Sequence, residues 1–278
     1  VEIRIIYDDV GCVGKISNKK IRELRNSGIK MCAFNKLRAS VNANNRDHRK
    51  IVVIDGTTAF TGGINIADEY INVTHPYGHW KDTGMKFSGT AAWSFTVMFL
   101  RFWQMLNEIE PDPYDFVPEK TEQPPEFCGY VQPLCSGPDK RTQLIKNSFL
   151  HIINNAKQYV YINTPYLIPD DEITSALCLA AKSGVDVRIT MPHIPDKKLI
   201  FTMSRSFYPP LLKAGVKIYE YVPGFVHAKS IVADGHTAYI GSCNFDYRSF
   251  FLHYEVGAIL YDAPSIEDMT KDYMQTLE

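Results

Sequence analysis

The sequence has no long apolar run and almost no net charge, and these two absences exclude several kinds of protein. No stretch of about 18 residues is apolar enough to cross a membrane, and no signal peptide is recognisable. The 30 Lys and Arg side chains are balanced by 31 Asp and Glu, so the formal net charge is −1. No overall positive field is therefore available to attract nucleic acid.

Cysteine pairing is also missing from the sequence. The six cysteines include no Cys-x-x-Cys pair and no His at zinc-finger spacing, which argues against a disulfide framework and against a structural zinc site. Hydrophobic residues make up 45% of the 278 positions and charged residues 22%, as in an ordinary globular chain that buries a large core. We expect reduced thiols and either one large domain or two joined ones.

One eight-residue pattern occurs twice. His48–Asp55 reads HRKIVVID, and His227–Asp234 reads HAKSIVAD, 179 residues later. The match continues in register through two Gly, an Ala and an Asn, which are Gly56, Ala59, Gly62 and Asn65 in the first copy and Gly235, Ala238, Gly241 and Asn244 in the second. A match of this length indicates an internal duplication.

The pattern of apolar residues predicts an α/β fold in both halves. In the first half it predicts strands over 1–7, 29–34, 48–54, 58–62 and 80–88 and helices over 17–27 and 90–108. In the second half it predicts strands over 130–134, 159–163, 185–191 and 216–221 and helices over 142–156, 171–182 and 197–214. We expect mixed β-sheets flanked by helices, in two similar halves that pack around a pseudo-twofold axis with the active site between them.

Five prolines lie between residues 110 and 126, where neither a helix nor a central strand can continue. We therefore expect a first repeat over 1–110, a Pro-rich linker over 111–126 and a second repeat over 127–278. The strand at 1–7 corresponds to 185–189, which a strand and a helix of the second half precede. This comparison predicts that the chain is a fragment truncated at its N-terminus, lacking the first strand and helix of its first repeat.

Each motif places an imidazole beside an ammonium group. Residues two apart on a strand share a face, so His48 lies beside Lys50 and His227 beside Lys229. The residues between Lys and Asp are almost all apolar, as in a strand that is buried on both faces. Two such pairs suit a phosphoryl group, because Lys supplies positive charge while one His attacks phosphorus and the other protonates the leaving oxygen.

The other polar residues of the repeat are expected to have different roles. Asn65 and Asn244 follow the returning strands, from where their amides can donate to the same phosphate oxygens. Asp55 and Asp234 lie at odd spacing from their His, so they face away and secure the turn. No acidic cluster accompanies the motifs. We expect no metal and no cofactor, with the two Lys side chains in place of a metal ion.

The paired motif H-x-K-x4-D, followed by G-G-x-N or G-S-x-N, resembles that of the phospholipase D superfamily. Several flanking segments are most similar to bacterial cardiolipin synthases. These segments are Asn45–Gly56, Gly62–Tyr70, Trp80–Thr83, Thr164–Asp170, Gly224–Lys229 and Asn244–Phe250. The resemblance covers essentially the whole chain.

The resemblance implies a two-step phosphatidyl transfer that makes cardiolipin from two phosphatidylglycerol molecules. His48 would form a phosphatidyl-histidine, and His227 would protonate the glycerol that leaves and then deprotonate the second phosphatidylglycerol. It assigns catalytic roles to His48, Lys50, Asp55, His227, Lys229 and Asp234. It assigns supporting roles to Asn65, Asn244, Asp82 and Glu255, the last two as carboxylates behind the histidines, and substrate contacts to Tyr166 and Ser242.

The resemblance also implies partners and a location. The partners would be phosphatidylglycerol and a membrane surface, with no nucleic acid. The full-length protein would lie at the bacterial cell membrane with its catalytic part in the cytoplasm, and this fragment would be soluble or peripheral. Three alternatives stay open: a phospholipase D or phosphodiesterase that uses water as the acceptor, a nuclease, and a non-catalytic protein that binds anionic lipid. The oligomeric state and the acceptor lipid are not readable from the sequence.

Two other features have more than one interpretation. His253 shares a strand face with Glu255, so it lies either in the pocket or in the core. The aromatic helix over 91–106 is either buried against the sheet or rests partly on a bilayer. His193 has no clear place, and His151 and His236 are expected at the surface. His75 and His79 are also expected on a surface loop, although, four residues apart, they could form part of a metal site if a third ligand were near.

Overall fold

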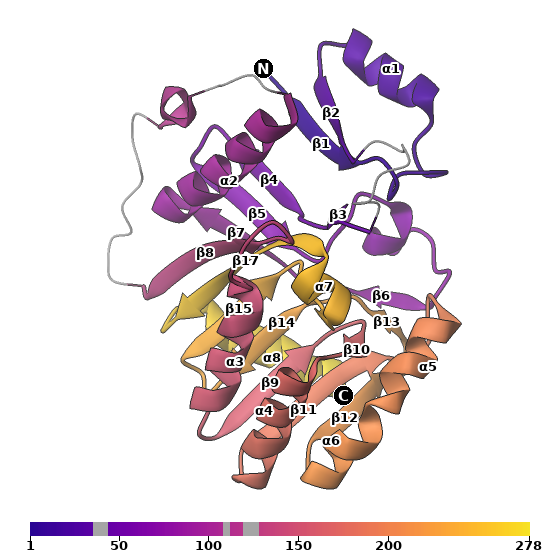
Figure 1. Ribbon diagram of the computed structural model, residues 1–278, viewed down its shortest axis with the longest axis vertical. Helices are drawn as coiled ribbons and strands as arrows, with labels where there is room; N and C mark the ends of the chain where they lie inside the picture. The colour runs from indigo at the N-terminus through magenta and orange to yellow at the C-terminus, as the bar shows by residue number, and fades with distance from the viewer. Residues whose placement is uncertain (36–43, 108–111, 119–127) are drawn as a thin grey trace.

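The computed structural model describes residues 1–35, 44–107, 112–118 and 128–278 (Figure 1). Its largest sheet belongs almost entirely to the second half of the chain. The strands run in the order β12 (Lys217–Tyr221), β11 (Asp186–Pro192), β9 (Tyr159–Asn163), β14 (Ser230–Ala233), β15 (Thr237–Gly241) and β17 (His253–Tyr261). On its other side, the Glu255–Tyr261 part of β17 pairs antiparallel with β8 (Tyr130–Ser136). The sheet is mixed, because β9, β11 and β12 are parallel and β14, β15 and β17 are antiparallel.

The first half forms two smaller sheets. One is the antiparallel set β4 (Ile51–Ile54), β5 (Thr58–Gly62) and β7 (Gly84–Ser88), and the other is the parallel pair β1 (Arg4–Asp8) and β2 (Lys30–Phe34). The hairpin β4–β5 matches β14–β15 of the second half in length and register, as the sequence repeat predicts.

Two short strands of the first half pair with the second half. β3 (Arg46–Asp47) lies parallel to the start of β17, and β6 (His79–Lys81) lies parallel to β13 (Gly224–Val226). Each pairing leads directly into a region that carries one of the histidine motifs. These cross-pairings bring the two motifs to the junction of the halves.

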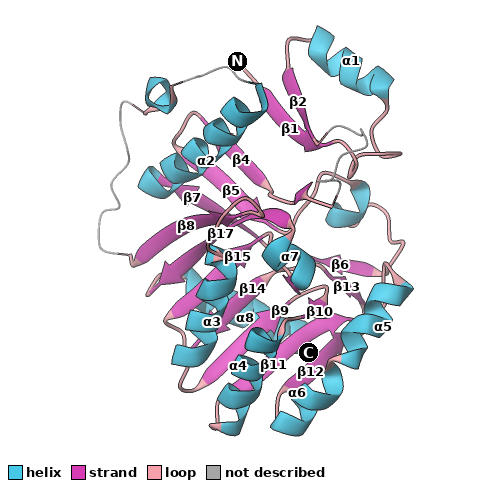
Figure 2. Cartoon of the chain, in the orientation of Figure 1, coloured by secondary structure: helices cyan, strands magenta, loops and turns pink. Residues whose placement is uncertain are grey.

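Helices cover both faces of the main sheet (Figures 1 and 2). On one face α3 (Leu144–Asn155), α4 (Asp171–Lys182) and α6 (Tyr208–Ala214) enclose a core that includes Phe149 and Ile189. On the other, α2 (Gly89–Asn107) and α8 (Ser265–Leu277) enclose a second core in which Phe95 of the first half packs with Val256 of the second. The halves therefore share a hydrophobic core, and α2 is buried against the sheet.

The shorter elements complete the chain. They are α1 (Asn18–Asn26), α5 (Lys198–Ser206), α7 (Tyr247–Phe251), η1 (Asp68–Ile71), η2 (Pro113–Phe116) and the pair β10 (Leu167–Ile168) with β16 (Phe245–Asp246). Helix starts follow the expected capping chemistry: the side chain of Asp170 accepts from Ile173 N at 3.0 Å at the start of α4. Among the described residues, no helix is long and apolar enough to cross a membrane.

The α/β class with two similar halves is confirmed, and three local expectations are wrong. The strand expected over 48–54 begins only at Ile51, and His48 and Lys50 precede it. The helix expected over 197–214 is two helices, because Pro209 and Pro210 fit only the first turn of a helix. The strand expected over 80–88 divides into β6 and β7.

The sequence predicts that the strand in each repeated motif is buried on both faces, and this is true of β14 but not of β4. β14 is buried throughout, whereas Val52 and Ile54 of β4 are 52% and 50% exposed. The residues that correspond to them, Ile231 and Ala233, lie under α3 and α4, and no helix among the described residues covers that face of β4. Much of the Pro-rich linker, including both of its expected boundaries, lies outside the described residues. Its described part contains η2.

Candidate active site

The two histidine motifs reach the same junction by equivalent backbone contacts. His48 N donates to Tyr254 O at 3.0 Å, next to the pairing of β3 with β17. His227 N donates to Lys81 O at 2.7 Å, next to the pairing of β13 with β6. Each motif is therefore held by a strand of the opposite half.

The carboxylates come from the same places, one on β17 and the other from the residue that follows β6. His48 Nδ1 lies 2.9 Å and 3.0 Å from the two oxygens of Glu255, and His227 Nδ1 lies 2.8 Å from Asp82 Oδ2. Both carboxylates are almost completely buried. A carboxylate on Nδ1 fixes the Nδ1–H tautomer, so each imidazole can present the lone pair of Nε2 to a substrate.

Each lysine stays beside its own histidine. Lys50 Nζ donates to His48 O at 2.6 Å, and Lys229 Nζ donates to His227 O. Burial lowers the pKa of Lys50 and lowers the pKa of Lys229 to about 7. The two ammonium groups also repel one another, which contributes to the low pKa of Lys229. An anion placed between them would relieve that repulsion.

The histidines are neutral in the unliganded site. Burial lowers the pKa of His48 to about 4, against the opposing effect of Glu255, and burial together with Lys229 lowers the pKa of His227 to about 3. Burial by itself would raise the pKa values of both carboxyls, but the electrostatic interaction and hydrogen bond with the paired histidine hold each below its ordinary value. Neutral imidazole beside ionised carboxylate is the state required for a nucleophile.

The surroundings of the two histidines differ. The ring of His227 lies 5.1 Å from Tyr70, 5.1 Å from Trp80 and 6.0 Å from Phe225, and its side chain is only 8% exposed. The side chain of His48 is 25% exposed. The aromatic surroundings were not expected from the sequence, although Trp80 and Phe225 lie in segments that resemble cardiolipin synthases.

The two asparagines do not have equivalent contacts. Asn65 Nδ2 donates to the hydroxyl of Tyr70 at 2.6 Å. Asn244 Nδ2 donates to Asp246 Oδ2 at 3.1 Å, and its buried Oδ1 has no hydrogen-bond partner. The amide donors of both residues are engaged with protein groups, so a direct role at the phosphate remains a prediction.

The motif aspartates lie away from the histidines, in the turns. Asp55 and Asp234 both have positive φ, 50° and 53°. The carboxylate of Asp234 accepts from the backbone N–H groups of Lys157, Gln158 and Tyr159 at 2.7–2.9 Å. These three bonds hold the pKa of Asp234 below its usual value, although burial alone would raise it. The geometry supports the turn-securing role and gives neither Asp a contact with the reacting groups.

Ser242 and Tyr166 were both expected at the substrate. Ser242 is fully buried, and its hydroxyl donates to Glu255 and accepts from Val256 N at 3.0 Å. In this position the hydroxyl supports the carboxylate, and the substrate contact expected of Ser242 remains a prediction. Tyr166 donates to Asp196 Oδ2 at 2.6 Å, and its ring lies 6.5 Å from Phe225. Phe225 also lies 6.0 Å from the ring of His227, so Tyr166 and His227 are both neighbours of Phe225.

His253 lies inside the site. Its ring centroid is 5.4 Å from that of His48, and its Nδ1 is 3.5 Å from Glu255 Oε1. The potential ligand atoms of His48, His253 and Glu255 lie within 4.8 Å of one another, a spacing that a metal ion could bridge. The Nδ1 of His48 and both oxygens of Glu255 are already hydrogen-bonded to one another, and this geometry holds a proton between them.

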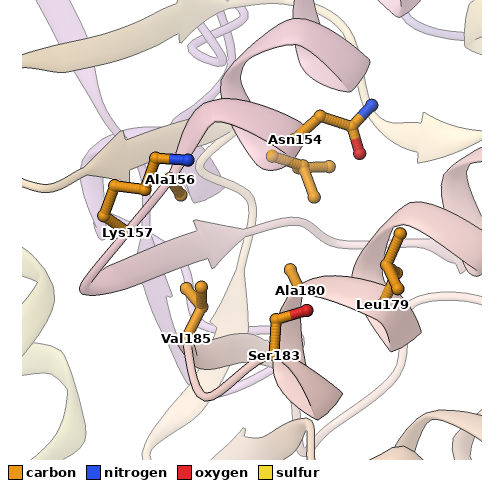
Figure 3. A pocket seen from close by; sticks show the side chains of 8 residues that line it. Asn154, Ala156, Lys157, Leu179, Ala180, Ser183 and Val185 are labelled. Carbon is orange, nitrogen blue, oxygen red and sulfur yellow. The ribbon is translucent and has the colours of Figure 1, made fainter.

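A pocket of about 310 Å³ lies elsewhere, between the C-terminal ends of α3 and α4 (Figure 3). Its walls include Asn154, Lys157, Leu179 and Ser183, and none of its lining residues belongs to the two motifs. The pocket is therefore not part of the histidine site.

Comparisons with known proteins agree with this geometry. The family model described as cardiolipin synthase, PLD-like domain, matches residues 1–76 and 149–277. A cardiolipin synthase of Geobacillus kaustophilus is 43% identical, with a match over 99% of this chain and 55% of that protein. Cardiolipin synthase 2 of Bacillus anthracis is also 43% identical, over 100% of this chain and 54% of that protein. The chain thus spans about half the length of these curated relatives.

The fold also matches a solved structure. The phosphatidylserine synthase of Haemophilus influenzae Rd KW20 superposes with a TM-score of 0.72 and 14% sequence identity, over 99% of this chain and 73% of that chain. At this identity the match concerns the fold. It extends over both halves and the junction between them.

Proposed function

The chain belongs to the family described as cardiolipin synthase, PLD-like domain, and we propose that it is the catalytic part of a phosphatidyltransferase. The proposed reaction joins two phosphatidylglycerol molecules into cardiolipin and releases glycerol. One observation carries the proposal: two His–carboxylate pairs, the partly buried Lys50 and the buried Lys229 meet at the junction of the halves.

In the first proposed step, His48 Nε2 attacks phosphorus of the first phosphatidylglycerol. The new N–P bond forms as the P–O bond to the glycerol headgroup breaks, and His227 gives a proton to the leaving oxygen. In the second step, His227 takes the proton from a hydroxyl of the second phosphatidylglycerol. That oxygen attacks phosphorus, and the N–P bond breaks. Glu255 and Asp82 stabilise the positive charge that each imidazole carries in turn.

The lysines and the pKa values fit this sequence of steps. Lys50 and Lys229 would bind the non-bridging oxygens, where negative charge is concentrated. Because His227 is neutral in the free site, the proton that it donates must be taken up with the substrate. The phosphodiester anion promotes this uptake, since a nearby negative charge raises the pKa of an imidazole.

Four further assignments belong to the proposal. The first repeat covers 1–110, the linker 111–126 and the second repeat 127–278. Asn65 and Asn244 reorient toward the phosphate when substrate binds, and Tyr166 contributes to the headgroup side of the pocket. The full-length protein acts at the bacterial cell membrane, because both of its substrates are membrane lipids.

A hydrolytic phospholipase D of the same superfamily is the second candidate. The chemistry of the first step would be identical, and water would replace the second lipid as the acceptor. The 25% exposure of the His48 side chain gives this alternative its support, because an open face at the nucleophile could admit water.

One assay separates the candidates. The protein is incubated with phosphatidylglycerol vesicles, and the lipid products are identified by mass spectrometry. Cardiolipin with an equal amount of glycerol supports the transferase, and phosphatidic acid supports the hydrolase. His48→Ala and His227→Ala should abolish turnover, whereas His151→Ala, at an exposed position on α3, should not. Full activity in either motif variant would refute the mechanism.

A further inference from the structure

His253 presents an unexplained pair of polar atoms. Its side chain is only 12% exposed, and both Nδ1 and Nε2 are buried without a hydrogen-bond partner. Buried polar groups are normally hydrogen-bonded, so such an exception calls for a reason. The ring lies against His48, and Nδ1 faces Glu255 Oε1 across 3.5 Å, just beyond a good hydrogen bond.

The other half of the site contains the same arrangement with a different ring. Trp80 precedes Asp82 by two residues, as His253 precedes Glu255 by two. The indole of Trp80 lies 5.1 Å from the ring of His227, and its Nε1 donates to Asp82 Oδ2 at 3.4 Å. Each carboxylate therefore has, two positions before it, a ring that packs beside the histidine it serves.

The donors on the two carboxylates can be compared directly. Asp82 accepts from His227 Nδ1, from the backbone N–H of Thr83 and from Trp80 Nε1. Glu255 accepts from His48 Nδ1 and from the hydroxyl of Ser242. A third donor from His253 would make the two sets equal, and a carboxylate has room for it.

We propose that His253 is a positioning residue for the reaction at His48. Its Nδ1–H donates to Glu255, as the indole N–H of Trp80 donates to Asp82, and this bond fixes the carboxylate that sets the tautomer and orientation of His48. The inference rests on the proposed function, because it assigns His253 to the nucleophile's side of that site.

The surrounding groups favour Glu255 as the acceptor. Asp246, a second buried carboxyl group that interacts electrostatically with His253, already accepts hydrogen bonds from Ser249 N at 2.7 Å and Asn244 Nδ2 at 3.1 Å. On β3, Arg46 lies opposite His253 in the register, and a cation cannot accept a hydrogen bond. Glu255 is the acceptor toward which Nδ1 is already turned.

The test compares two substitutions of similar size. His253→Leu removes both nitrogens, whereas His253→Asn keeps an N–H close to the position of Nδ1. We expect His253→Leu to lower kcat about tenfold, with KM unchanged, as befits the loss of one hydrogen bond to a charged group. His253→Asn should restore kcat to within about threefold of the original protein. Trp80→Phe is the matched change on the other side and should lower kcat by a similar factor.

A second measurement does not depend on lipid turnover. The Nδ1–H proton of His48, held by Glu255, should give a low-field NMR resonance that broadens or shifts in His253→Leu and is retained in His253→Asn. A wild-type kcat together with an unchanged resonance in His253→Leu would overturn the inference, as would equal losses in both variants. If His48→Ala is fully active, the proposed function fails, and the resonance still decides whether His253 holds Glu255.

Discussion

His227 Nδ1 lies 2.8 Å from Asp82 Oδ2, so the histidine of the second repeat is paired with a carboxylate of the first. The reciprocal pair, His48 with Glu255, crosses the junction in the opposite direction. Neither motif histidine takes its carboxylate from its own half. The pairing of β6 with β13 and of β3 with β17 therefore assembles the site as well as the fold.

The crossed carboxylates give the first prediction. Asp82→Asn and Glu255→Gln keep the shape of each side chain but remove its charge, and the new amide favours the wrong tautomer of the paired histidine. Each change should lower kcat by about 10³-fold or more, as the loss of such a carboxylate does in hydrolytic triads. Turnover of phosphatidylglycerol vesicles measures the effect. Asp268→Asn, on the surface helix α8, is the control, and a loss of less than about threefold in both site variants would contradict the proposed roles.

Lys229 gives a prediction about pH. Its pKa is about 7 in the free protein, so Lys229 loses its proton and its charge as the pH rises through that value. If Lys229 binds the phosphate, kcat/KM, which reports on the free enzyme, should fall as pH rises above about 7. Lys229→Arg should move this fall to higher pH, because a guanidinium stays protonated throughout that range. A fall at an unchanged pH in Lys229→Arg would assign it to another group.

The repeat in the sequence was enough to identify the histidines and lysines, but not their carboxylates. Counting 179 residues on from Asp82 gives Tyr261, and counting back from Glu255 gives Pro76, so neither carboxylate is repeated in register. They lie on β17 and just after β6, strands that attach to the opposite half, and such long-range pairing leaves no periodic signal. In the sequence, only the family resemblance indicates these two carboxylates.

Side-chain direction was the other quantity that the sequence did not determine. Ser242 follows the second motif hairpin, a position from which a hydroxyl could face either the substrate or the carboxylate. Tight packing of β15 on β17 turns it toward Glu255. The same is true of His253, whose place on the face of Glu255 was predicted from strand alternation but whose contact with His48 was not.

Ser242 gives the third prediction. Ser242→Ala removes a donor from the buried carboxylate that serves His48, and it leaves Val256 N without its side-chain acceptor. We expect kcat to fall about tenfold while KM stays unchanged, because the hydroxyl acts through Glu255 and does not contact the lipid. Ser148→Ala, which removes an exposed hydroxyl from α3, is the control. A rise in KM with an unchanged kcat would instead support the substrate contact that the sequence predicts for Ser242.

The motif aspartates give the fourth prediction, which concerns stability. Asp234→Gly removes an acceptor of three backbone N–H groups and should lower the free energy of unfolding by about 2 kcal/mol. Asp55→Gly is the matched control, because glycine suits the positive φ of both positions and Asp55 is exposed. Urea unfolding should show a clear loss in the first variant and little change in the second.

The pH dependence of the Asp234 effect provides a further check on its cause. The pKa of Asp234 is lowered in the folded protein, so its contribution to stability is present above the unfolded value of roughly 3.9 and is lost as the pH falls through the folded pKa. The difference between the original protein and Asp234→Gly should therefore shrink as the pH falls below about 4. The folded Asp234→Gly protein should keep kcat within about twofold, because the hydrogen bonds of this carboxylate among the described residues go to the backbone just before and at the start of β9. A large loss of kcat in the fully folded variant would instead show that Asp234 has a catalytic role.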